Sequence, residues 1–226
     1  MMALYAYILL GSLSFPLLFS LFYKDLINHW KSFGISTLSI AILFLIWDAE
    51  FTKNGVWGFE TTYCIGIYFF KMPIEEWLFF FIIPFSSLFI HFALFHSFPK
   101  LKLNKNISKY LSSLLIILSV YLISTQHTKA YTLVNFSILA CILLTGLIYH
   151  QTLLQKFYLS FLIILFPFLI VNGILTGALT ETPIVWYNNS ENLGIRVGTI
   201  PVEDFGYAFS MLFGNLMLFE SIKKTK

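Results

Sequence analysis

Charged side chains are scarce in this chain of 226 residues. Asp, Glu, Lys and Arg together make up 11% of the sequence, whereas hydrophobic residues make up 58%. A soluble globular domain carries about a quarter charged residues, so this inventory cannot cover a water-facing surface. The composition therefore excludes a soluble domain and predicts a polytopic membrane protein. The net charge of +3 gives no reason to expect a nucleic-acid partner, because the basic residues fall in short loops.

Cysteines and cofactor motifs are also scarce. Cys64 and Cys141 fall in different segments, so neither a disulfide framework nor a metal knuckle is expected. His91 and His96 are five positions apart, which does not place them on one ligand face of a helix. No Gly-x-Gly-x-x-Gly fingerprint follows a strand. We therefore expect neither a bound metal nor a cofactor.

Long apolar runs are what the chain does contain. A spanning helix needs about 20 apolar residues, and continuous rather than alternating apolarity favours helices over a barrel. The first run has no basic flank before it and no small-residue cleavage site after it, so we interpret it as a retained helix. The runs are 3–23, 32–51, 74–96, 108–125, 131–150, 157–178 and 203–221. The expected fold class is an all-α polytopic membrane protein with seven transmembrane helices.

The distribution of basic residues predicts the orientation of these helices. With the N-terminus outside, ten lysines fall on the inner side, whereas three lysines and Arg196 fall on the outer side. Lysine and arginine are enriched in cytoplasmic loops. We therefore expect the N-terminus outside and the C-terminus in the cytoplasm. The usage of Lys, Asn and Ile is compatible with a prokaryotic cell membrane.

One motif occurs twice in register. Pro73-Ile74-Glu75-Glu76 lies 128 positions before Pro201-Val202-Glu203-Asp204, and Gly66-Ile67 lies 128 positions before Gly194-Ile195. This register predicts two parallel three-helix repeats joined by a connector helix. The expected boundaries are 1–100, 101–128 and 129–226. Because a single helix connects the two three-helix repeats, both acidic motifs are expected on the same side of the membrane, at one end of a cavity between the repeats.

Helix capping explains part of this motif. Proline is favoured at the start of a helix, and acids in the first turn complement the helix dipole. Capping explains less well why the first acid is glutamate in both repeats. Ionisable groups at membrane depth are costly and are usually functional, so we expect a buried glutamate here to act as a proton donor. Arg196 precedes the second motif and is expected to pair with one of the acids or with lipid phosphate.

These residues resemble the integral-membrane carotenoid cyclases of the heterodimer-type lycopene cyclase family. The resemblance rests on the paired Pro-x-Glu-Glu/Asp motifs, on Trp47-Asp48, on Asn54-Gly55-Val56-Trp57, and on the run from Glu191 to Arg196. It covers essentially the whole chain. In this family the two repeats occur as separate small subunits or as one fused chain, and this sequence is similar to the fused form.

The resemblance implies an isomerase of the lycopene β-cyclase type, which converts lycopene to β-carotene through γ-carotene without net redox change and without a flavin. A general acid protonates C2 of the linear end, the C5–C6 double bond attacks the cation at C1, and a base removes a proton from C6 or C4. On this resemblance we expect Glu75 or Glu203 to be the acid. Glu76, Asp204 and Asp48 are then expected to be the acceptor or its tuning partners.

An excess of aromatic residues, 19% of the chain with 26 Phe, is expected to line the cavity and stabilise cations. Asn172 is expected there as the neutral counterpart of Asp48. The expected partners are a linear carotenoid and membrane lipid, and association with other carotenoid-pathway enzymes or as a homo-oligomer stays open. The expected substrate-contacting residues are Trp47, Trp57, Trp77, Phe80, Asn172, Trp186 and Phe205.

Three other functions compete with this interpretation. A transporter with parallel three-plus-one-plus-three repeats has the same plan, but the polar side chains here concentrate at the membrane edge rather than at its centre. A retinal photoreceptor is disfavoured because the run 203–221 contains no lysine for a Schiff base. A non-catalytic carotenoid-binding protein is the third alternative, and it applies if the acids only cap helices.

Overall fold

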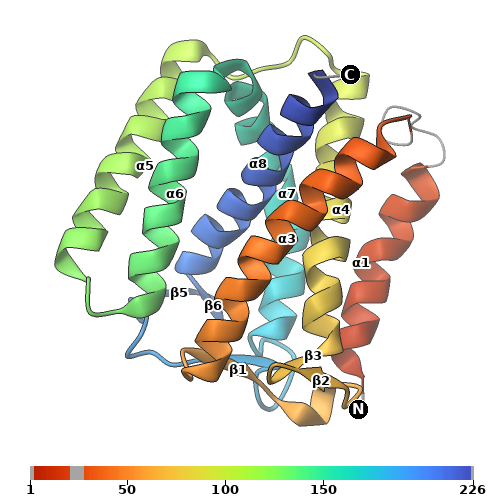
Figure 1. The fold of residues 1–226 in the computed structure, drawn as a ribbon, viewed down its shortest axis with the longest axis vertical. Helices are drawn as coiled ribbons and strands as arrows, with labels where there is room; N and C mark the ends of the chain where they lie inside the picture. Colours follow the sequence, from red (N-terminus) through yellow and green to blue (C-terminus); the bar gives the residue numbers. More distant parts are fainter. Residues whose placement is uncertain (1–2, 21–27, 225–226) are drawn as a thin grey trace.

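The computed structural model describes residues 3–20 and 28–224, and these form a bundle of seven long helices (Figure 1). The helices are α1 (Leu4–Ser20), α3 (Trp30–Lys53), α4 (Ile74–Ser97), α5 (Lys105–Thr125), α6 (Ala130–Tyr149), α7 (Gln151–Leu175) and α8 (Glu203–Lys224). Six of them are long and apolar enough to cross a membrane, and α1 is shorter, with 17 described residues. The predicted fold class, an all-α multi-pass membrane protein, is confirmed.

Helix ends differ from the predicted runs where polar residues continue a helix. α7 begins at Gln151 rather than at 157, because apolarity marks only the part of a helix that lies in lipid. The end of the first predicted run, 21–23, lies outside the described residues. The start of α1 and the end of α8 lie at opposite ends of the bundle (Figure 1), as an odd number of spanning helices requires.

Three short antiparallel ribbons, in the segments between the predicted apolar runs, gather at the end of the bundle that holds the N-terminus (Figure 1). Strand β1 (Trp57–Phe59) pairs with β4 (Val185–Tyr187). The other pairs are β2 (Tyr68–Phe69) with β3 (Met72–Pro73) and β5 (Arg196–Val197) with β6 (Ile200–Pro201). Each strand of the first repeat lies 128 positions before its counterpart in the second, and the β1–β4 ribbon joins the repeats.

The helices of the two repeats pack in matching pairs. α1 packs along α4 and α6 packs along α8, so each repeat keeps its first helix against its acidic-motif helix. Between repeats, α3 packs on α8 and α4 packs on α7. The connector α5 lies at the edge of the bundle against α6 and α7 (Figure 1). The two repeats therefore share one hydrophobic core, and neither repeat has a separate core of its own.

Buried polar contacts fix the two inter-repeat helix pairs. The side chain of Asn215 on α8 accepts a hydrogen bond from Ser36 (2.8 Å) and donates one to Thr37 (3.0 Å), both on α3. His91 on α4 and Ser160 on α7 are 2.8 Å apart. Since hydrocarbon offers buried polar groups no other partner, these contacts favour one relative position of the helices. His91 is thus a buried residue of the helix packing.

Candidate active site at the ribbon end

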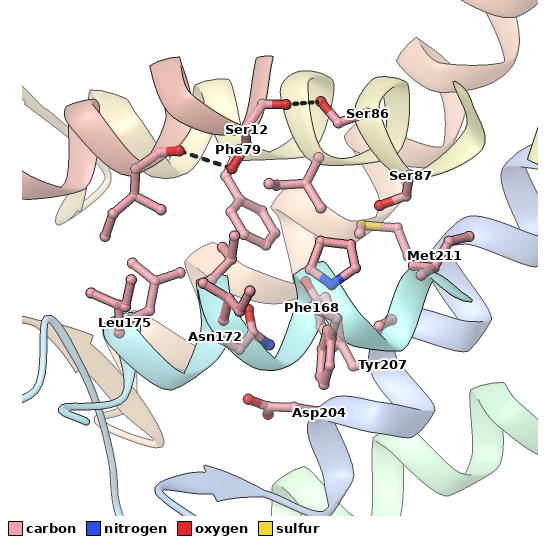
Figure 2. A pocket seen from close by; sticks show the side chains of 18 of the residues that line it. Ser12, Phe79, Ser86, Ser87, Phe168, Asn172, Leu175, Asp204, Tyr207 and Met211 are labelled. Carbon is pink, nitrogen blue, oxygen red and sulfur yellow. Dashed lines mark hydrogen bonds between the residues drawn. The ribbon is translucent and has the colours of Figure 1, made fainter. Parts of the chain in front are cut away.

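A cavity of about 870 Å³ lies inside the bundle, between α7 on one side and the paired helices α1 and α4 on the other (Figure 2). α8 closes it with Tyr207, Ala208, Met211 and Leu212. Most of the lining is apolar, and the ionisable side chains concentrate at the end near the ribbons. A mainly apolar pocket with a few convergent polar groups is the usual form of a small-molecule site.

Three carboxyl groups face this cavity. Asp48 comes from the last two turns of α3, Glu76 from the first turn of α4, and Asp204 from the first turn of α8. Their exposed fractions are 2%, 8% and 4%. The structure therefore brings together acids from three helices and both repeats. Asn172 of α7, the counterpart of Asp48, lines the same cavity (Figure 2).

Glu76 and Asp48 form a close pair. Glu76 Oε2 accepts a hydrogen bond of 2.5 Å from the Tyr5 hydroxyl, and Asp48 Oδ1 accepts one of 2.5 Å from Trp57 Nε1. Thr52 adds a weaker bond of 3.3 Å to Asp48. Both carboxyl groups line the same apolar cavity. Two carboxyl groups in one apolar site repel each other when both are ionised, so such a site is most stable when they hold one proton between them.

Asp204 has a different environment, because two tyrosines donate to it. The Tyr131 hydroxyl donates to Oδ1 at 2.6 Å, and the Tyr187 hydroxyl donates to Oδ2 at 3.0 Å. Desolvation, followed by the negative charge of Asp204, raises the pKa of Tyr187 well above its ordinary value, so this phenol keeps its proton. Hydrogen bonds to both oxygens stabilise the ionised form of a carboxyl group. Asp204 therefore differs from Glu76 and Asp48 in having a tyrosine hydroxyl donor on each of its carboxyl oxygens.

The tyrosines of this site were not predicted from the sequence. Tyr5 and Tyr131 are each the second residue of the first helix in their repeat, and each donates to the second acid of that repeat. They lie 126 rather than 128 positions apart. A comparison of the first residues of corresponding helices finds this pair of tyrosines, whereas a search for residues repeated at 128 positions does not. Tyr187 and Tyr207 have no comparable signal.

Glu75 and Glu203, the first acid of each pair, are fully buried but do not line the cavity. Glu75 Oε1 accepts a hydrogen bond from the backbone N–H of Ile65 at 2.6 Å. Glu203 Oε1 accepts one from Leu193 N–H at 2.8 Å and another from the Thr132 hydroxyl at 2.7 Å. Ile65 and Leu193 are again 128 positions apart. This shared bond to the preceding loop explains why both repeats carry glutamate at this position.

Removing the Glu203 side chain is expected to destabilise the protein. Glu203→Ala leaves the Leu193 N–H and the Thr132 hydroxyl without their acceptor, and each unpaired buried group costs about 1–3 kcal/mol. Thermal unfolding of the purified protein in detergent measures the loss. Glu203→Gln retains an acceptor oxygen and is the matched control. Equal midpoints for the wild type and Glu203→Ala would show that this bond does not hold the loop.

The aromatic residues predicted to contact substrate divide into two groups. Trp57 lines the cavity. Trp47 does not line it, but the centre of its ring is 4.8 Å from that of Tyr207, which does. The remaining four are not part of the cavity lining. Trp77 contacts Phe69 and Phe70 of the β2–β3 turn, Phe80 is in the apolar core, Trp186 covers Gly58 in the β1–β4 ribbon, and Phe205 packs on Phe168.

The Arg196 side chain forms hydrogen bonds at the β5–β6 ribbon rather than an ion pair with a carboxylate. Its guanidinium donates to the Thr199 carbonyl at 2.6 Å and to the Asn189 side chain at 2.9 Å. It also lies over the ring of Tyr187, 5.7 Å from the ring centre. Arg196 therefore supports the tyrosine that donates to Asp204.

Comparisons with known proteins identify the family. Neither the curated proteins nor the solved structures contain a match to this chain. The model of the lycopene cyclase family matches residues 2–94 and 128–222, which are the two segments that contribute the acids, tyrosines and ribbons of the site. The chain therefore belongs to the lycopene cyclase family and is a multi-pass membrane protein whose substrate is a lipophilic carotenoid.

Proposed function

We propose that this protein is an isomerase that cyclises the linear ends of lycopene by acid–base chemistry and produces β-carotene through γ-carotene. The observation that carries the proposal is the meeting of Asp48, Glu76 and Asp204 at one end of an apolar cavity of about 870 Å³. A cyclisation without net redox change needs one proton donor, one proton acceptor and an apolar cavity lining that excludes water. Each requirement corresponds to a group in this cavity.

The proton donor in this proposal is the Glu76–Asp48 pair. The pair gives its shared proton to C2 of the linear end, which leaves a tertiary cation at C1. The π electrons of the C5–C6 double bond form the C1–C6 bond, and the cation moves to C5. Trp57, Phe79 and Tyr207 line the cavity, and the faces of such rings stabilise a passing cation.

The proton acceptor is Asp204. It removes the proton from C6, and the C5–C6 double bond forms again inside the new ring. The proton returns from Asp204 to the Glu76–Asp48 pair before the next cycle, so no proton is consumed overall. This assignment gives the proton transfers to the second acid of each motif. Glu75 and Glu203 then have a structural role, because they accept hydrogen bonds from the preceding loops.

Product analysis tests the function directly. The full chain is expressed in cells that accumulate lycopene, and the pigments are separated by chromatography. We expect γ-carotene first and β-carotene later, with lycopene consumed. Lycopene that co-purifies with the protein without conversion would support a carotenoid-binding protein instead. Neither conversion nor co-purification would leave the transporter as the better explanation.

The placement of the chain in the membrane is part of the proposal. We infer two catalytic repeats, 1–100 and 129–226, with 101–128 as connector. The N-terminus lies outside and the C-terminus in the cytoplasm, as the lysine distribution predicts. The carboxyl groups then lie near the outer face of the membrane.

A further inference from the structure

Some residues that line the cavity are also exposed on the outside of the bundle. Phe15 on α1 is 62% exposed and Phe166 on α7 is 72% exposed, and Gly11 and Ile170 on the same two helices are exposed as well. By contrast, the lining residues Met211 and Leu212 on α8 are at most 2% exposed. The cavity is therefore closed towards α8 and open at the side, between α1 and α7.

This lateral opening does not reach the ribbon end of the helices. There, Tyr5 and Leu9 of α1 form one buried cluster with Leu175 of α7 and Ile184. Phe15 lies about 9 Å further along α1 than Leu9, at 1.5 Å per residue. The opening thus lies within the membrane-spanning part of the two helices and faces the acyl chains of the lipid rather than water.

A proline lies in the helix on each side of the opening. Pro16 and Pro167 lie inside these helices, and both line the cavity. A proline inside a helix lacks an N–H and leaves the carbonyl four residues earlier without its usual donor. For Pro16 this is the carbonyl of Ser12, which accepts a hydrogen bond of 2.8 Å from the Ser86 hydroxyl of α4 (Figure 2). That bond holds α1 against α4, on the side away from α7.

The corresponding helices of the bundle pack differently. The counterparts of α1, α4 and α7 are α6, α8 and α3, and there Phe44 and Trp47 of α3 pack their rings against Tyr207 of α8. Tyr207 lies 5.0 Å from Phe44 and 4.8 Å from Trp47, measured between ring centres. Among the described residues, the α1, α4 and α7 side of the pseudo-symmetric bundle therefore holds the cavity with its lateral opening, and the α6, α8 and α3 side holds this aromatic cluster.

We propose that the gap between α1 and α7 is the entrance through which a linear carotenoid passes from the lipid into the cavity, with one end leading towards Glu76 and Asp204. The inference rests on the proposed function. An apolar chain dissolved in the bilayer reaches this gap without crossing water, and the cavity extends from Glu76 to Ile90 along α4, about 21 Å. Because the acids lie at one end, one end group is cyclised at each entry, and the molecule leaves and re-enters for the second.

Substituting a bulky residue at Gly11 tests the entrance. A side chain at Gly11 meets no atom within 4 Å of its Cβ, so Gly11→Trp fits the fold and fills the gap. Gly34→Trp is the matched control, because Gly34 also has open space and is exposed on α3 but does not line the cavity. We expect Gly11→Trp to slow lycopene conversion in reconstituted vesicles by about tenfold or more, because entry then limits the rate. Gly34→Trp should convert at the wild-type rate.

Uptake of lycopene by the protein in lipid nanodiscs, followed by its absorption shift, separates this inference from the proposed function. Slow uptake by Gly11→Trp alone supports the entrance even if no variant forms a ring, in which case only the proposed function fails. Equal uptake and conversion by Gly11→Trp, Gly34→Trp and wild type overturns the entrance. If Gly11→Trp does not accumulate, Ile170→Trp, with Leu162→Trp as its exposed control outside the cavity lining, makes the same comparison on α7.

Discussion

Replacing Glu76 with glutamine is expected to lower the rate of lycopene cyclisation by about a hundred- to ten-thousandfold, the usual contribution of general acid–base catalysis. Glutamine retains the size of the side chain and an acceptor for the Tyr5 hydroxyl, which donates to Glu76 at 2.5 Å. It cannot share a proton with Asp48. The substituted protein should therefore fold and bind lycopene but should not protonate it.

Glu75→Gln is the matched control for this experiment. Glu75 is the neighbouring residue, is also buried, and does not line the cavity. The amide oxygen of glutamine still accepts the Ile65 N–H, which lies 2.6 Å from Glu75 Oε1. Turnover per folded molecule should therefore stay close to that of the wild type. The measurement is the initial rate of ring formation in reconstituted vesicles, divided by the amount of folded protein.

The reverse result would contradict the assignment. If Glu75→Gln stops cyclisation and Glu76→Gln does not, the first acid of the motif is the donor, as the resemblance alone suggested. Substrate binding by both variants, measured through the absorption of bound lycopene, shows whether a low rate comes from lost chemistry or from lost binding.

The repeat could be predicted from the sequence because it preserves a register. The offset of 128 positions holds for the strands, for the prolines before α4 and α8, and for the glutamates that bind Ile65 and Leu193. These parts form one continuous segment without insertions. The offset changes to 126 for Tyr5 and Tyr131, because the segments between the helices differ in length. An exact search therefore misses the tyrosines.

The sequence could not decide which of two adjacent acids faces the cavity. Neighbouring residues on a helix point about 100° apart, since a turn contains 3.6 residues. Whether Glu75 or Glu76 faces inward depends on the rotation of α4 against α1 and α7. Packing of distant residues sets that rotation, including the contact of His91 with Ser160 and of Ser86 with Ser12. Neither contact has a local pattern.

The ribbons were missed for a related reason. β1 and β4 have three residues each, and the other four strands have two. An alternating pattern needs four or more residues to be recognised. The partner of β1 also lies in the other repeat, so no hairpin signal predicts it. Yet this ribbon places Trp57 beside Asp48 and Tyr187 beside Asp204.

Replacing Asp204 with asparagine is expected to change the product as well as the rate. The amide of the substituted side chain would retain an acceptor oxygen, but it could not take up the proton that leaves the C5 cation. We expect the rate to fall by about a hundredfold or more. The remaining product should contain a larger share of ε-rings, because a base in another position removes the proton from C4 instead of C6.

Chromatography of the products, with rings identified by their absorption and mass spectra, measures both effects. Glu203→Gln is the control, because Glu203 is adjacent, buried and outside the cavity lining. It should yield β-rings at close to the wild-type rate. The Glu76→Gln variant provides a second comparison, since loss of the donor lowers the rate without altering which proton is removed. Asp204→Asn protein that makes only β-rings at the normal rate would exclude Asp204 as the acceptor. The Glu76–Asp48 pair, which lines the same cavity, would then have to perform both proton transfers.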